Sequence, residues 1–86
     1  MQIIYCIDDP FVFGLTVYSR DDETGKVNRL FSGSKEEVCH YMAFEWNNAD
    51  YERILIHSID SEEMKEIIYQ YSMVNFNNTD IRIEVV

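Results

Sequence analysis

Three carboxylates occupy positions from which they could bind a divalent metal ion. Asp8 follows an apolar run at residues 2–7, and Asp60 follows a second apolar run that lies within residues 52–58. Glu37 lies near the start of a helical pattern. Carboxylate oxygens are the ligands that Mg²⁺ prefers, and a pair of such ions activates water for phosphodiester cleavage. Asp8 and Asp60 are therefore candidate Mg²⁺ ligands, with Glu37 as a candidate third catalytic carboxylate.

Each of these carboxylates also has a structural interpretation, which the local sequence favours. Ser34 and Glu37 have the spacing of a capping box at a helix N-terminus. Asp60 is suited to cap a second helix, with Glu63 three residues further on. Asp8 stands beside Asp9 just before the only proline, where turn residues are common. These roles need no metal ion.

The charge balance favours a protein partner over nucleic acid. The formal net charge is −9, from 16 acidic and 7 basic residues. Such a chain repels phosphate backbones and anionic membranes, so we expect no direct contact with nucleic acid or membrane. An array of carboxylates can instead dock in the basic channel of a nucleic-acid-handling enzyme, or it can simply be a solvated surface. The candidate partner-binding residues are Asp21, Asp22, Glu23, Glu62, Glu63 and Glu66.

Aromatic residues offer a second binding hypothesis. Phe11, Phe13, Tyr18 and Phe31 could form a platform on which bases stack. The basic residues are scattered along the sequence, so the platform lacks positive charge, and core packing is the favoured role.

The two cysteines and the first residues of the sequence give an indication of the cellular compartment of the protein. Cys6 lies in a strand-like run and Cys39 in a helical one, which favours two buried free thiols. Cys39 and His40 are adjacent on a helix, so they point in different directions and do not form a metal-ligand pair. Met1 leads directly into an apolar strand without the features of a signal peptide. We expect a cytoplasmic protein with no transition-metal site.

The elements that must position these residues follow from periodicity. Strands are predicted at residues 2–7, 11–19, 26–32, 52–58 and 81–85, with a polar hairpin loop at 20–25. One helix begins after Ser34 and ends at Asn47-Asn48, and another begins at Asp60 or Ser61. Residues 75–80 are predicted to form a loop. Length and continuity indicate one α/β domain spanning residues 1–86.

This order predicts a five-stranded mixed sheet with two helices. Three antiparallel strands come first, followed by two helical crossovers, which are right-handed between parallel strands. The simplest arrangement is βββαβαβ with strand order 3-2-1-4-5. The apolar runs at 3–7 and 54–56 are then parallel neighbours at the centre of the sheet, covered on both faces.

The succession of elements resembles a minimal ribonuclease H-like core. In "IIYCIDD" Asp8 ends the first strand, and in "ILIHSIDSEEM" Asp60-Ser61 follows the fourth. Glu37 loosely matches a glutamate near the start of the family's first helix. The resemblance implies a nuclease that uses Mg²⁺ held by Asp8 and Asp60. Asp9-Pro10 stands where enzymes of the family often carry glycine or serine, and this difference favours a form without catalytic activity.

The sequence thus leads to three hypotheses about function. The favoured one is a small acidic interaction protein with a basic partner, similar in size and charge to small phage or mobile-element inhibitors. The second is the Mg²⁺-dependent nuclease remnant. The third is a homo-oligomer, such as a dimer, formed by pairing of the edge strand at residues 81–86.

Overall fold

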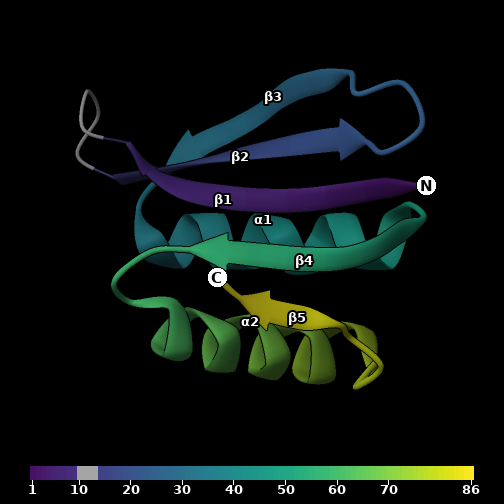
Figure 1. The fold of residues 1–86 in the computed structure, drawn as a ribbon. Coiled ribbons are helices and arrows are strands. Elements are labelled where there is room, and N and C mark those ends of the chain that lie inside the picture. Colours follow the sequence, from purple (N-terminus) through teal and green to yellow (C-terminus); the bar gives the residue numbers. More distant parts are fainter. Residues whose placement is uncertain (10–13) are drawn as a thin grey trace.

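The fold confirms the predicted order of elements. The computed structural model describes residues 1–9 and 14–86. Its strands and helices are β1 (Gln2–Asp9), β2 (Gly14–Asp21), β3 (Val27–Gly33), α1 (Lys35–Asn48), β4 (Tyr51–His57), α2 (Ser61–Phe76) and β5 (Ile83–Val85). They form one sheet of order β3-β2-β1-β4-β5 (Figure 1). Residues 11–13, which were predicted to open the second strand, lie outside the described residues.

The two apolar runs are parallel neighbours, as predicted. Ile4 of β1 pairs with Ile54 of β4, and Tyr5 pairs with Leu55, in a parallel ladder. On its other side β1 pairs with β2 in antiparallel fashion, and Tyr5 lies opposite Tyr18. Because the carboxyl ends of β1 and β4 meet at one rim of the sheet, Asp8 and the segment after His57 are neighbours.

The molecule has two layers, and both helices lie on the same face of the sheet (Figure 1). Both crossovers are directed from the β3 side toward the β5 side, so their common handedness puts α1 and α2 on one face. The core between the layers is made of fully buried side chains such as Ile4, Ile54, Met42 and Ile68. The expectation that the central strands are covered on both faces is therefore wrong, since no helix of the described chain covers the other side.

Two predicted boundaries differ from the structure. Helix α2 continues through Asn75 and Phe76, which were assigned to a loop, and ends where Asn77 adopts a left-handed conformation with φ of 51°. Strand β5 is limited to Ile83–Val85, so the edge proposed for pairing at residues 81–86 is shorter than expected. The Phe76 ring lies 6.4 Å from that of Phe44 on α1, a contact that holds the last turn of α2 against α1, and 6.3 Å from that of Tyr71 on its own helix.

Candidate functional site

Asp8 and Asp60 meet at the rim where β1 and β4 end, and Ser58 connects them. The Ser58 Oγ donates a hydrogen bond to Asp8 Oδ1 at 2.9 Å. The same Oγ accepts a hydrogen bond from the backbone N–H of Asp60 at 3.2 Å. The sequence placed Asp8 and Asp60 at one rim of the sheet, as the structure does, but it did not indicate Ser58, because a serine before a helix is common in turns.

The interpretation of Asp60 as a side-chain cap is wrong. Asp60 occupies the N-cap position of α2, yet its side chain makes no capping hydrogen bond. Its backbone carbonyl accepts from the N–H of Met64 at 2.9 Å, while its carboxylate lies 3.9 Å from Lys35 Nζ on α1. The backbone of Asp60, with φ of −98° and ψ of 21°, also lies outside the extended conformation that is usual for an N-cap residue.

Glu37 is used by the capping box, as its spacing with Ser34 predicted. Its Oε1 accepts hydrogen bonds from the Ser34 N–H at 3.2 Å and from the Ser34 Oγ at 2.8 Å. The Ser34 Oγ in turn accepts from the Glu37 N–H at 3.3 Å. These hydrogen bonds hold the pKa of Glu37 below its usual value. A carboxylate engaged in this way stabilises the start of α1 rather than facing Asp8 and Asp60.

Lys35 joins the beginnings of the two helices. Its Nζ donates to Glu63 Oε2 at 2.7 Å. This hydrogen bond is the main cause that raises the pKa of Lys35, and the charges of Glu63 and Asp60 add to it. The ammonium group therefore stays protonated beside the candidate ligand Asp60.

The rim does not fit the three-carboxylate metal centre that the sequence suggested. Among residues 1–9 and 14–86, no group of three or more His, Cys, Asp or Glu side chains is arranged to hold a metal ion. Asp8 and Asp60 remain as two carboxylates, one of them close to a lysine. This arrangement can order the rim through Ser58, and we derive no hydrolytic step from it.

The six candidate partner-binding carboxylates fall into two groups at opposite ends of the molecule. Asp21, Asp22 and Glu23 lie on the hairpin between β2 and β3, at the end where the chain begins (Figure 1). Glu62, Glu63 and Glu66 lie on the first turns of α2, at the other end. No single flat surface presents both groups, because the domain extends 31 Å along its longest axes.

An apolar groove lies between α1 and α2 on the outer surface of the helix layer. Its volume is about 420 Å³, and its lining residues are His40, Glu66, Ile67, Gln70, Tyr71, Val74 and Asn75. The rings of His40 and Tyr71 stack with centroids 4.0 Å apart and form part of it. Nearby, Phe44 is 50% exposed and Val74 is 74% exposed. Apolar side chains this exposed are typical of an interaction surface.

This groove was missed by the sequence analysis, although a signal for it exists. Ile67, Tyr71 and Val74 follow helical spacing and were partly counted as the buried stripe of the second helix. On α2 the fully buried stripe is instead formed by Met64, Ile68 and Ser72. A helix with apolar residues on two faces presents one to the core and the other to solvent or a partner.

The cysteines are buried free thiols, as predicted. Burial raises the pKa of Cys6 and that of Cys39, each to about 12. Thiolate is the nucleophilic form, so neither thiol can act as a nucleophile near neutral pH.

Comparisons with models of protein families, with curated proteins and with solved structures found no match to this chain. The resemblance to the ribonuclease H-like superfamily stays a prediction. Within the described part of the chain, no helix is long and apolar enough to cross a membrane.

Proposed function

We propose that this protein is a small, acidic, cytoplasmic interaction protein without catalytic activity. It docks on a basic surface of a protein partner, of the kind that the partner uses to bind nucleic acid. The observation that carries the proposal is the apolar groove between α1 and α2, together with the carboxylates beside it. By covering such a surface the protein would act as an inhibitor, competing with the nucleic acid.

The groove and the carboxylates supply different parts of the interaction. Burying an exposed apolar side chain such as Val74 contributes about 1.5–3 kcal/mol to association. Glu66 lines the groove itself, and Glu62 lies one helical turn before it on α2. Carboxylates at the edge of an apolar contact mainly accelerate encounter and select a basic partner, while the apolar contact slows dissociation.

The test is a pair of charge reversals with equal change in net charge. The double variant Glu62→Lys with Glu66→Lys reverses the charge beside the groove. The double variant Asp22→Lys with Glu23→Lys reverses the charge at the hairpin between β2 and β3. All four side chains are exposed, so both variants are expected to fold. We expect the α2 variant to lose a partner captured from lysate by the wild type, and the hairpin variant to retain it. Added heparin, a polyanion, should release the captured partner by occupying its basic surface.

Two outcomes would contradict the proposal. One is capture of the same proteins in equal amount by the wild type and the α2 variant. The other is a captured partner that heparin does not displace, because that partner would not be held through a polyanion-binding surface. Val74→Ser offers a further check, since it reduces apolar area in the groove without any change of charge.

The second candidate function is the Mg²⁺-dependent nuclease remnant. The contact of Ser58 with both Asp8 and Asp60 favours it, because that contact keeps two carboxyl-bearing residues at one rim. Calorimetric titration with Mg²⁺ tests it directly. Binding that is lost in the double variant Asp8→Asn with Asp60→Asn would support this function over the leading proposal.

A further inference from the structure

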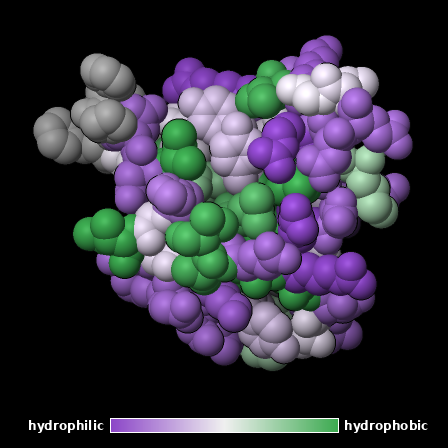
Figure 2. Space-filling view, viewed as in Figure 1, coloured by the Kyte–Doolittle hydropathy of each residue, from purple (hydrophilic) through white to green (hydrophobic). Residues whose placement is uncertain are grey.

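The uncovered face of the sheet gathers arginines that look scattered in the sequence. Arg20 of β2 and Arg53 of β4 both pair with Ile3 of β1, one on each side. Arg29 of β3 pairs with Tyr18 of β2. Residues paired across neighbouring strands project to the same face. Three of the chain's four arginines therefore project from the face opposite the helices, which Figure 2 views directly.

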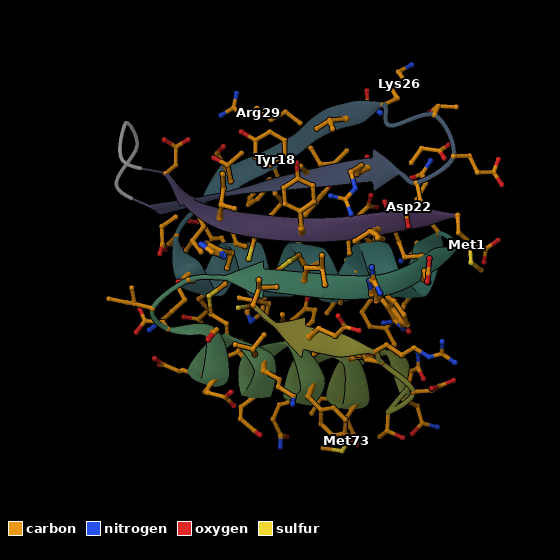
Figure 3. The ribbon with its side chains drawn as sticks, in the orientation of Figure 1. Met1, Tyr18, Asp22, Lys26, Arg29 and Met73 are labelled. Atoms are coloured by element: carbon orange, nitrogen blue, oxygen red, sulfur yellow. The ribbon has the colours of Figure 1, made fainter. Side chains whose placement is uncertain are left out.

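Two stacked tyrosines lie at the centre of this face. The rings of Tyr5 and Tyr18 have centroids 5.3 Å apart and an angle of 20° between their planes. The Arg20 guanidinium carbon lies 6.0 Å from the centre of the Tyr5 ring. Figure 3 shows the Tyr18 side chain near the middle of the sheet, and both tyrosines are half-buried there. An aromatic ring that is partly accessible can stack with an unpaired base.

Each of the three arginines has a polar partner, and only that of Arg29 is close: its Nη2 donates to Ser32 Oγ at 2.6 Å. Arg20 Nε lies 3.4 Å from Asp22 Oδ1, and Arg53 Nη1 lies 3.8 Å from Glu84 Oε1. Both distances exceed the 2.7–2.9 Å or so of strong charge-assisted hydrogen bonds. Arg53 Nε makes no hydrogen bond to any described group, but this atom is buried and so is not itself open to a ligand. The planar guanidinium group of an arginine matches the oxygen atoms of a phosphate group with its outer donors.

We propose that the uncovered sheet face binds single-stranded nucleic acid. Bases stack on Tyr18, and Arg20, Arg29 and Arg53 contact the phosphates. The arginines extend from β3 to β4, a width of about 14 Å at the usual strand spacing, which is more than a single nucleotide covers. A duplex hides its base faces, so the platform selects unpaired strands.

This proposal reverses the expectation that the chain does not contact nucleic acid. That expectation rested on the net charge of −9, which takes no account of where the charges lie. Many of the carboxylates lie on the hairpin and on the first turns of the helices, away from Tyr18. On this face Asp22 lies beside Arg20 and Glu84 beside Arg53, so the three arginines offset nearby carboxylates and make the face less negative than the chain as a whole. The other carboxylates of the molecule still repel the phosphates of the strand. A longer strand carries more phosphates, so we expect the affinity to depend on the length of the strand.

The test is fluorescence anisotropy with a labelled oligothymidylate of about eight nucleotides, within the range that one small domain binds. At low salt we expect saturable binding that weakens as salt rises. Tyr18→Leu should weaken binding about tenfold, whereas Tyr18→Phe keeps the ring and should bind like the wild type. Arg53→Gln should weaken binding and reduce the salt slope by about one.

Matched controls keep the result interpretable. Tyr69→Leu makes the same change at an exposed tyrosine of α2, and Lys65→Gln removes a positive charge from that helix. Neither should alter binding. If Tyr18→Leu fails to fold, Arg53→Gln still decides the question.

Each of several outcomes would overturn the proposal. The first is no binding of the oligomer by the wild type at low salt. The second is unchanged affinity in folded Tyr18→Leu or Arg53→Gln. The third is equally tight binding of a duplex of the same length. The fourth is displacement of the oligomer by free thymidine monophosphate at equal concentration, which would make the site one for a free nucleotide.

Discussion

At the scale of single residues, the roles of the carboxylates depend on which hydroxyl or ammonium group lies beside them. Glu37 receives two hydrogen bonds from Ser34, whereas Asp60 receives none at its side chain and lies near Lys35 instead. Both residues follow the sequence pattern of a helix start, yet only one of them caps its helix through its side chain. A residue type at the right spacing permits a contact, and competing partners decide whether it forms.

The capping box gives a prediction about stability. Ser34→Ala removes the hydroxyl that accepts from the Glu37 N–H, so the free energy of unfolding should fall by about 1 kcal/mol. For a domain of this size that corresponds to a midpoint about 4–8 °C lower in thermal denaturation. Ser34→Thr keeps a hydroxyl and should lie close to the wild type. An unchanged midpoint in Ser34→Ala would show that this cap contributes nothing.

The buried thiols give a prediction about alkaline pH. Burial raises the pKa of the Cys6 thiol from its ordinary value of 9.0 to about 12 in the folded protein. Between these values the unfolded chain releases a proton that the folded one keeps, so the free energy of unfolding falls as pH rises from about 9 to 12. Burial also raises the pKa of Tyr51, which acts in the same direction.

Urea unfolding at several pH values measures this slope. Cys6→Ala should be less stable at neutral pH, because it leaves a cavity, but its loss of stability above pH 9 or so should be shallower. Native protein should also react slowly with a thiol reagent at pH 8, and both cysteines should react once the chain unfolds. Rapid reaction of the folded protein would contradict the burial of the thiols.

At the scale of elements, local pattern predicts most helices and strands but not where they end. The strands β1 and β4 and the helix starts are visible in the sequence because each has its own periodicity or cap. The end of α2 is not, because the last turn with Phe76 packs against Phe44 of α1, a contact that the local sequence does not show. Asparagine-rich sequence favours a loop there, and tertiary packing overrides that preference.

The end of α2 gives a prediction that separates backbone conformation from side-chain contact. Asn77 is exposed and left-handed, and its N–H donates to the carbonyl of Met73 at 3.1 Å. Asn77→Ala should lower the free energy of unfolding by about 1 kcal/mol, because alanine tolerates this conformation poorly. Asn77→Gly should equal or slightly exceed the wild type. Urea denaturation of both variants checks this, and equal stability of the two would contradict the backbone explanation.

The candidate sites were only partly predictable from the sequence, because strand pairing and helix packing bring together residues that lie far apart in the chain. Asp8 and Asp60 could be assigned to one rim because both follow apolar runs that must pair. Arg20, Arg29 and Arg53 lie far apart in the sequence, and only the pairing of four strands shows that they share a face. The groove between α1 and α2 likewise needs the packing of two helices, which no local pattern describes.

At the scale of the whole molecule, the two layers give it two chemically different surfaces. The helix layer presents an apolar groove with carboxylates beside it, and the uncovered sheet presents tyrosines with arginines. Because they lie on opposite faces, the proposed docking on a basic partner and the proposed binding of a single strand would not overlap. Loss of one activity in its variants should therefore leave the other intact.

The excess of negative charge gives a last prediction, about salt. Ion pairs between exposed side chains contribute little, and the four that join a lysine or arginine to a carboxylate among the described residues all involve side chains that are at least 34% exposed. A net charge of −9 meanwhile destabilises the compact state by self-repulsion. Raising the ionic strength from about 0.01 M to 0.15 M shortens the screening length from about 30 Å to 8 Å, which weakens repulsion across the molecule.

We therefore expect sodium chloride over this range to raise the midpoint of thermal denaturation by about 4–8 °C, equivalent to about 1 kcal/mol. Glu62→Lys with Glu66→Lys brings the formal net charge from −9 to −5, so its midpoint should respond less. The response should also disappear near the isoelectric point of about 4.4, where repulsion between like charges is smallest. A midpoint that falls with added salt at neutral pH would mean that attraction within ion pairs such as Lys35–Glu63 outweighs the repulsion.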